Sequence, residues 1–187
     1  FKGVKIGVIT VASIDDNMDF FRKCQKFNIP IVFGMKDDME AFPEYFLKEI
    51  LKESKIIFTN EVECEIIKHI KGISDIKELF IDGKVDILVT TLGADGSICY
   101  IRKGEKIIEK RIESIRINNV VDASGGGDAY MSGFLYGYLK DFDPVDCCRF
   151  GTIMASHIIQ KEGCLSNVPD ESKLLGDFDS RFKKEVE

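Results

Sequence analysis

The chain lacks the features that mark several large classes of protein. Only 4 of its 187 residues are proline and 44% are apolar, which excludes a collagen-like or low-complexity disordered chain. No basic run is present and the formal net charge is −6, so nucleic acid is not an expected partner. No apolar stretch reaches the length of a membrane span and no signal-peptide pattern occurs, so no membrane partner is expected.

Cysteine and histidine are not arranged for metal binding either. None of the six cysteines forms a C-x-x-C pair, and Cys147 is followed directly by Cys148, a poor geometry for an internal bridge. The two histidines, His69 and His157, have no metal-ligand partner at a useful spacing. We therefore expect ordinary helical histidines and small buried thiols in a reducing compartment, which makes the cytoplasm the expected location.

Short apolar runs alternate with helical patterns through the first half of the chain. The run at residues 4–10 is rich in β-branched residues and fits a strand buried on both faces. Further strands are expected at residues 31–33, 55–59 and 85–91. Helical patterns lie at residues 17–27, 42–51, 60–70 and 74–80. This alternation predicts an α/β fold with a mostly parallel sheet and right-handed crossovers.

The second half begins with a hairpin signal and continues with helices. Residues 97–102 and 106–111 alternate like strands around Lys103-Gly104-Glu105. Helical patterns follow at residues 128–139, 144–160 and within 170–187. Because no linker or repeat interrupts the chain, we expect residues 1–187 to form one α/β domain that carries a short β-hairpin. The chain opens on Phe1 just before a strand, and we expect that further residues precede it in the protein.

A glycine-rich turn before one of these helices is the most informative segment. Gly125, Gly126 and Gly127 precede a helix that is predicted to begin at Asp128. Without side chains the backbone approaches an anion closely, and the N–H groups and dipole of a helix start favour negative charge. Taken alone, Asp128 is more typical of a helix cap. The alternative is a general base beside an anion hole, the pairing that in-line phosphoryl transfer requires.

Two further motifs follow predicted strands. Asn60 and Glu63 are three residues apart and share a helix face, an arrangement that is equally typical of a capping box. Residues 91–96, T-L-G-A-D-G, form a glycine-containing turn, which is frequent after a strand. Ligands commonly bind at the carboxyl ends of strands in open α/β sheets, so both motifs also lie where a binding site is expected.

The segment from residue 122 to residue 134 resembles the signature of the ribokinase (PfkB) family of sugar and nucleoside kinases. It reads D-A-S-G-G-G-D-A-Y-M-S-G-F, where the family has D-T-T-G-A-G-D-A-F followed by a small residue, glycine and an apolar residue. The departures are mild and fall at Ala123, Ser124, Gly126 and Tyr130. The resemblance implies a three-layer α/β/α ribokinase-like fold and a kinase that uses ATP and Mg²⁺. It also implies that Asp128 is the catalytic base and that residues 125–127 form the anion hole.

The other two motifs occur in the order that the family has, and the resemblance assigns them binding roles. The family's N-x-x-E motif implies that Asn60 and Glu63 help to organise Mg²⁺, water and the ATP phosphates, with Glu63 acting on Mg²⁺ through water. Its T-x-G-x-x-G stretch implies phosphate contacts from Thr91 and Gly93. Gly96 belongs to the same nucleotide-binding turn and chiefly permits it.

The later part of the chain adds weaker resemblances. Residues 150–156 are similar to the small-residue helix that lines the family's adenine pocket, with Thr152 in place of the usual asparagine and with Ser156 on the same helix. Small residues on a helix are also typical of close packing. Some family members bind a monovalent cation such as K⁺ near the start of the signature, which makes Asp122 and Ser124 candidate ligands. Residues 31–36 lack the family's usual aspartate, which leaves nucleoside and other acceptors open.

The resemblance covers nearly the whole chain but only the later part of a family member. The early glycine pair and the β-rich lid, which contact the acceptor in the family, are not recognisable. Members often dimerise through that lid, so a homodimer is a candidate assembly. Three alternatives to a sugar or nucleoside kinase stay open: a vitamin or pyrimidine kinase of the wider fold, a nucleotide-binding regulatory module, and a fragment that binds ATP without turnover.

Overall fold

Six strands form one sheet in the computed structural model, which describes residues 1–183. The strands follow one another across the sheet in chain order. They are β1 (Gly7–Ile9), β2 (Ile31–Gly34), β3 (Ser54–Asn60), β4 (Ile87–Thr91), β5 (Ser97–Lys103) and β6 (Lys106–Ile112). The pairs β1–β2, β2–β3 and β3–β4 are all parallel, which confirms the predicted mostly parallel sheet.

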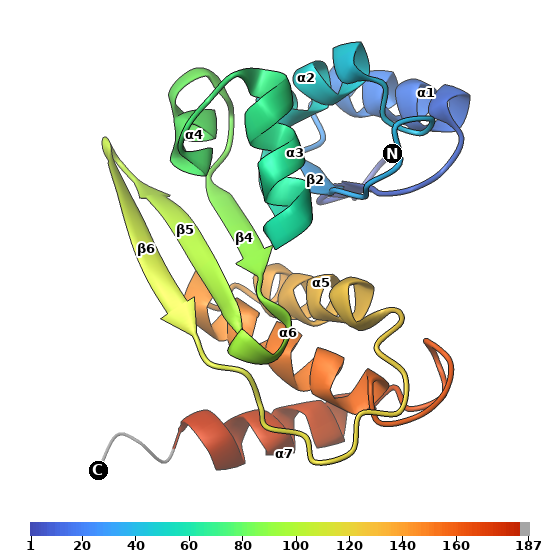
Figure 1. The fold of residues 1–187 in the computed structure, drawn as a ribbon, viewed down its shortest axis with the longest axis vertical. Helices are drawn as coiled ribbons and strands as arrows, with labels where there is room; N and C mark the ends of the chain where they lie inside the picture. The colour runs from blue at the N-terminus through green and yellow to red at the C-terminus, as the bar shows by residue number, and fades with distance from the viewer. Residues whose placement is uncertain (184–187) are drawn as a thin grey trace. The chain divides into compact units, whose positions relative to one another are not determined.

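Helices connect the parallel strands and make up most of the chain after the last strand (Figure 1). The connecting helices are α1 (Ile14–Lys26), α2 (Glu44–Glu53), α3 (Glu61–Lys71) and α4 (Leu79–Asp82). Two short 3-10 turns accompany them, η1 (Ile76–Glu78) before α4 and η2 (Gly93–Asp95) after β4. After β6 come α5 (Gly126–Leu139), α6 (Pro144–Ile158) and α7 (Glu171–Phe182).

Side-chain caps account for where several helices begin. Ser13, Asp143 and Asp170 accept hydrogen bonds from N–H groups in the first turns of α1, α6 and α7. Each cap satisfies a donor that has no partner within the helix, which is worth about 0.5–2 kcal/mol. Because the cap of α1 lies at Ser13, this helix begins at Ile14 rather than at the predicted residue 17. The predicted tail helix is confirmed as α7, while its expected extension to residues 184–187 lies outside the described residues.

The first strand is shorter and less buried than the sequence predicts. Only Gly7–Ile9 pairs with β2, although a strand was expected over residues 4–10. Ile9 is buried but Val8 is exposed, so the expected burial on both faces is wrong for this strand. The physical reason is that successive side chains of a strand point to opposite faces, and only the face of Gly7 and Ile9 is covered, while that of Val8 is open. By contrast, all four residues of β2 are buried.

The described chain divides into two compact units. The first unit contains residues 1–91 and 100–109, and the second contains residues 92–99 and the chain from residue 110 onward. The hairpin strands β5 and β6 therefore contribute residues to both units. The expected single domain over residues 1–187 stays a prediction.

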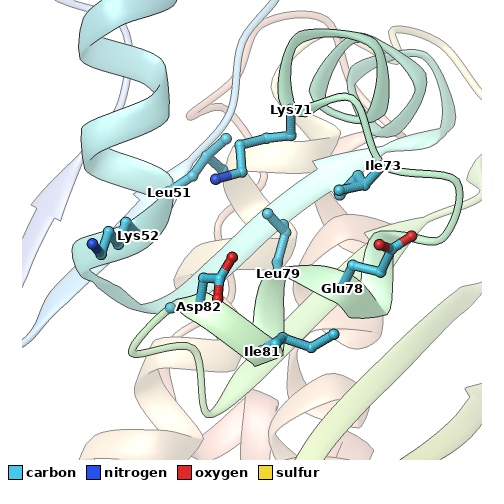
Figure 2. A pocket seen from close by; sticks show the side chains of 9 residues that line it. Leu51, Lys52, Lys71, Ile73, Glu78, Leu79, Ile81 and Asp82 are labelled. Atoms are coloured by element: carbon cyan, nitrogen blue, oxygen red, sulfur yellow. The ribbon is translucent and has the colours of Figure 1, made fainter.

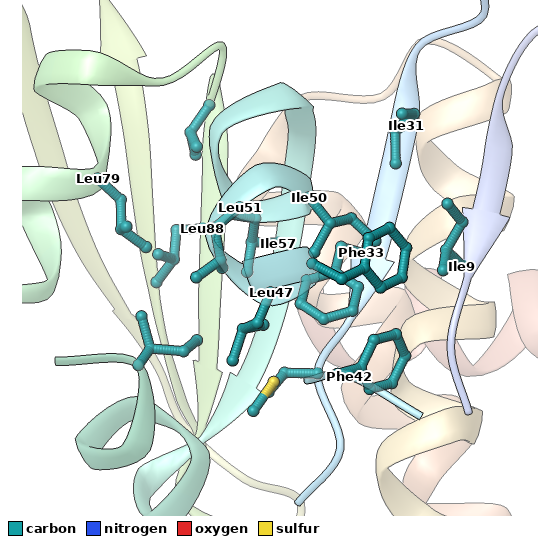
Figure 3. Close-up of a cluster of buried hydrophobic side chains, with 14 of the residues drawn as sticks. Ile9, Ile31, Phe33, Phe42, Leu47, Ile50, Leu51, Ile57, Leu79 and Leu88 are labelled. Atoms are coloured by element: carbon teal, nitrogen blue, oxygen red, sulfur yellow. The ribbon is translucent and has the colours of Figure 1, made fainter. Parts of the chain in front are cut away.

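The core of the first unit packs strand residues against α2 (Figure 3). Phe33 of β2 meets Phe42 with 5.1 Å between ring centroids and 72° between ring planes, an edge-to-face arrangement that aromatic rings favour. Ile57 of β3 and Leu88 of β4 are fully buried in the same cluster. Complete burial of such a side chain stabilises a protein by about 1.5–3 kcal/mol. This packing fixes the two strands whose carboxyl ends carry the predicted binding motifs.

In the second unit, α5 and α6 lie side by side because glycines stand where they meet (Figure 1). A Cβ atom on Gly133 would lie 2.5 Å from the carbonyl oxygen of Phe150. A Cβ atom on Gly151 would lie 2.7 Å from the carbonyl oxygen of Tyr130. Phe150 in turn stacks on Phe178 of α7, with ring centroids 4.2 Å apart. The second unit is therefore built on close helix packing, as the small residues of α6 suggested.

The cysteines are unpaired, and most of them are buried as expected. Cys164 is the exception, because it lies in the exposed loop after α6, so the expectation of a buried thiol is wrong there. Across residues 1–183, no group of three or more His, Cys, Asp or Glu side chains is arranged to hold a metal ion. No helix among these residues is both long and apolar enough to span a membrane. The cytoplasmic location stays a prediction.

Candidate active site

The glycine turn before α5 has a backbone that only glycine adopts readily. Gly125 is the N-cap of the helix and has φ 75° and ψ −2°, the left-handed conformation. A Cβ atom on Gly125 would lie 2.7 Å from Sγ of Cys164. A Cβ atom on Gly127 would meet no other atom within 4 Å. The turn is therefore closed behind Gly125 by the later loop and open beside Gly127, where an anion has room to approach the start of α5.

Asp128 lies in the first turn of α5, directly after the glycines, and is exposed. A carboxylate at this position interacts favourably with the helix dipole. The helix begins at Gly126 instead of the predicted Asp128, so Asp128 is inside the helix and is not its N-cap residue. Its place beside the open glycine turn suits a base that acts next to a bound phosphate, and that role stays a prediction.

Asp122 ties the entrance of the glycine turn to the loop after α6. Its Oδ1 accepts a hydrogen bond from the N–H of Ser124 at 2.8 Å, and its Oδ2 accepts one from the N–H of Gly163 at 3.1 Å. The hydrogen bonds from Ser124, and then the one from Gly163, hold the pKa of the Asp122 carboxyl below its ordinary value. Gly163 and Cys164, although distant in sequence, therefore contact the glycine turn and limit its movement. The suggested K⁺ site at Asp122 and Ser124 stays a prediction.

The second glycine-containing turn, residues 92–96, is closed by its own backbone. The N–H of Leu92 donates to the carbonyl oxygen of Gly96 at 2.8 Å. Gly96 has φ 90°, and a Cβ atom there would overlap the carbonyl oxygen of Ile112. Glycine is therefore required at residue 96 for the turn itself, as the sequence suggested. Gly93 faces open space, and the phosphate contact expected there stays a prediction.

In the first unit, the structure brings Asn60, Glu63 and Thr91 together at the carboxyl ends of β3 and β4. Asn60 Oδ1 accepts from the N–H of Glu63 at 2.9 Å, and Glu63 Oε2 accepts from the N–H of Asn60 at 2.8 Å. The capping box is therefore present. Asn60 pairs in register with Thr91, whose Oγ1 donates to the carbonyl oxygen of Thr59 at 3.3 Å. This cluster of oxygen atoms has the chemistry that Mg²⁺ prefers.

Sequence reasoning missed a pair of threonines beneath this cluster. Thr59 and Thr90 are buried partners in the β3–β4 register, and their hydroxyl oxygens lie 3.0 Å apart. A buried polar group needs such a partner to avoid a desolvation penalty. A signal existed in the sequence, because each threonine directly precedes the first residue of a motif, Asn60 or Thr91.

The two α6 residues expected at the adenine pocket use their hydroxyls within the helix. Thr152 donates to the carbonyl oxygen of Cys148 at 3.0 Å, and Ser156 donates to that of Ile153 at 2.7 Å. Both residues are buried. These bonds support a packing role, while contact with a nucleotide stays a prediction for Thr152 and Ser156.

His157 has a structural partner that the sequence did not reveal. Its Nε2 lies 2.7 Å from Oδ2 of Asp177, which links α6 to α7. Burial raises the pKa of Asp177, but the hydrogen bond with His157 and the charge of Lys173 outweigh it and leave the pKa below its ordinary value. The interpretation of His157 as an ordinary helical residue is therefore incomplete.

A surface hollow in the first unit contains none of the predicted site residues. Its volume is about 130 Å³, and its lining residues come from α2, α3 and the segment around α4 (Figure 2). They are Leu51, Lys52, Lys71, Ile73, Glu78, Leu79, Ile81, Asp82 and Gly83. Figure 2 shows Leu79 and Ile81 beside the charged side chains. This mixed lining lacks the glycine-rich backbone of the two turns, so the candidate active site remains with the motifs.

The chain matches a known family and known folds. Residues 12–171 match the model of the pfkB family carbohydrate kinases. The "Nucleoside kinase" of Methanocaldococcus jannaschii is 32% identical over 162 residues, which are 84% of this chain and 51% of that protein. An "Uncharacterized sugar kinase" of Archaeoglobus fulgidus is 34% identical over 66% of this chain and 47% of its own length. The chain thus spans about half the length of these relatives.

Solved structures show the same fold. The nucleoside kinase of Burkholderia thailandensis in complex with inosine has a TM-score of 0.87 at 22% identity, covering 98% of this chain and 59% of that one. The nucleoside kinase of Methanocaldococcus jannaschii, described as an archaeal member of the ribokinase family, has a TM-score of 0.80 at 27% identity, covering 94% and 56%. The predicted ribokinase-like α/β/α fold class is therefore confirmed.

Proposed function

Because this chain belongs to the pfkB family of carbohydrate kinases, we propose that the protein carrying it moves the γ-phosphoryl group of ATP to a hydroxyl or hydroxymethyl group of a sugar or nucleoside. The observation that carries the proposal is the turn before α5. There the left-handed Gly125 leads into a helix start that is open beside Gly127 and is followed at once by Asp128. An anion site and a carboxylate on one turn are what phosphoryl transfer needs.

In the proposed reaction, Asp128 accepts the proton of the attacking hydroxyl as its oxygen bonds to the γ-phosphorus. The bond from that phosphorus to the bridging oxygen breaks, and ADP leaves with the electron pair. The backbone of residues 125–127 holds the charge that develops on the transferred group. Asn60 and Glu63 are the residues that would hold the hydrated Mg²⁺ that accompanies ATP, because their capping-box bonds keep both side chains at the carboxyl end of β3. When bound, that ion neutralises phosphate charge.

We propose a nucleoside as the acceptor class. Two relatives carry nucleoside kinase names, from Methanocaldococcus jannaschii and Methanothermobacter thermautotrophicus, and a cytidine kinase of Thermococcus kodakarensis is 30% identical over 63% of this chain. After β2, where sugar kinases of the family often carry an aspartate, the chain has the buried Met35. A buried apolar side chain offers no hydrogen bond to a sugar hydroxyl.

The test is ATP consumption by the full-length protein on a panel of nucleosides, sugars and sugar phosphates, with and without Mg²⁺. Asp128→Asn is expected to lower turnover by about 10²–10⁴-fold, the usual contribution of a general base, while ATP binding is kept. Asp141→Asn is the matched control. Asp141 follows the same helix, is exposed and has φ 62°, a conformation that asparagine adopts as readily. Near-normal turnover of Asp128→Asn would overturn the base assignment.

A nucleotide-binding protein without turnover is the second candidate, because the open helix start beside Gly127 supports anion binding by itself. About half of each of the first two relatives has no counterpart in this chain. If the acceptor is held by such a region, the residues described here bind ATP but transfer nothing by themselves. Tight ATP binding with no consumption on any acceptor would select this candidate.

A further inference from the structure

We propose that a buried hydroxyl pair, Ser97 and Tyr130, positions the two glycine turns of the second unit relative to each other. Oγ of Ser97 and Oη of Tyr130 lie 2.8 Å apart. Ser97 is 0% exposed and Tyr130 is 5% exposed. In such surroundings a hydroxyl needs a hydrogen-bond partner; Ser97 supplies an oxygen partner to Tyr130, and the thiol of Cys148 also lies within reach of it. The identity of the ligand that the two turns bind rests on the proposed function. The hydrogen bond that joins the turns does not depend on it.

Each partner is attached rigidly to one of the turns. Ser97 directly follows Gly96, the residue that closes the turn of residues 92–96. Tyr130 is two residues beyond Asp128, and one helical turn from the glycines at the start of α5. The hydrogen bond therefore joins the end of one turn to the base of the other.

The ring of Tyr130 has little room to move away from this bond. A Cβ atom on Gly151 of α6 would lie 3.0 Å from ring atoms Cδ1 and Cε1 of Tyr130. Burial raises the pKa of Tyr130 well above its ordinary value, and the nearby Cys148 raises it further. The hydroxyl therefore stays protonated and available as a donor at all physiological pH values.

This pair is a feature of this chain and not of the signature that it resembles. The signature has phenylalanine where this chain has Tyr130, so this chain carries a hydroxyl at a buried place where the signature has none. A hydrogen bond is directional, whereas apolar packing tolerates small shifts. Displacements of about 1 Å are enough to disturb a site that must fit a ligand closely. We therefore expect Ser97 and Tyr130 to act as positioning residues for nucleotide binding.

The experiment is a double-mutant cycle with Tyr130→Phe, Ser97→Ala and the double variant in the full-length protein. For each, ATP affinity is measured by calorimetry, thermal stability by circular dichroism, and amide hydrogen exchange at residues 92–97 and 125–128 by mass spectrometry. Each single variant breaks the hydrogen bond between Ser97 and Tyr130, so we expect ATP affinity to fall roughly five- to thirtyfold. We also expect faster exchange in both turns.

The double variant separates positioning from simple stability. It removes both hydroxyls, so its thermal stability is expected to recover most of the loss, while ATP affinity stays low and exchange in both turns stays fast. Recovery of affinity together with stability would overturn the positioning role, as would unchanged exchange in the single variants. If the unmodified protein binds no ATP, the proposed function fails, and the exchange measurement still decides whether the pair links the turns.

Discussion

Replacing Gly125 with alanine is expected to destabilise the protein for two reasons that the structure separates. The first is conformational, because φ 75° at Gly125 costs a residue with a Cβ atom about 1–2 kcal/mol. The second is steric, because that Cβ atom would lie 2.7 Å from Sγ and 2.9 Å from Cβ of Cys164. Cys164 is exposed, so its loop relieves part of the clash by moving, and we assign this effect about 1 kcal/mol.

The sum, about 2–3 kcal/mol, corresponds to a melting temperature roughly 4–12 °C lower in a domain of this size. Gly127→Ala is the matched control on the same turn. Alanine is better than glycine within a helix by about 0.5–1 kcal/mol, and its methyl group would meet no atom within 4 Å at Gly127. Gly127→Ala is therefore expected to melt at or above the temperature of the unmodified protein.

Nucleotide binding should rank the two variants differently. The added methyl at Gly127 enters the space through which we propose that phosphate approaches, so ATP affinity is expected to fall at least about tenfold, or 1.4 kcal/mol. Thermal melts followed by circular dichroism and ATP titrations by calorimetry give both quantities. A Gly127→Ala protein that binds ATP normally would refute the phosphate cradle. A Gly125→Ala protein that melts with the unmodified one would refute the strained turn.

Two further predictions concern two polar pairs, Thr59 with Thr90 and His157 with Asp177. Thr59→Val and Thr90→Val each break the 3.0 Å hydroxyl pair, while the remaining hydroxyl keeps other partners, such as the carbonyl oxygen of Val89 for Thr59. Each should therefore cost about 0.5–1.5 kcal/mol, and the double variant less than the sum, by urea denaturation. An additive result would contradict a direct interaction. Asp177 has a lowered pKa in the folded state, so its stabilisation is present above about pH 4 and is lost as pH falls through the folded pKa. Asp177→Asn should therefore be less stable at pH 7, and the difference from the unmodified protein should shrink as the pH is lowered below 4; a difference that does not change with pH would contradict this.

Much of the fold was readable from local patterns. The β-branched runs predicted β2, β3 and β4, and the capping box of Asn60 and Glu63 was visible from its spacing. These features depend on residues a few positions apart, whose preferences act before any tertiary contact forms. The burial of β1 was predicted wrongly because the burial of a strand face depends on what packs over it, and nothing in residues 4–10 shows that the face of Val8 is open.

Local sequence patterns were enough to predict the kind of site: a glycine turn, an aspartate after it, and two motifs at strand ends. The hydrogen bonds that hold these segments in place depend instead on tertiary packing. Asp122 reaches the N–H of Gly163, and Ser97 reaches Tyr130, partners that are 41 and 33 residues apart in the chain. Such contacts follow from the packing of whole elements, since closing long loops costs entropy that only a formed core repays. For that reason a local sequence pattern does not predict them.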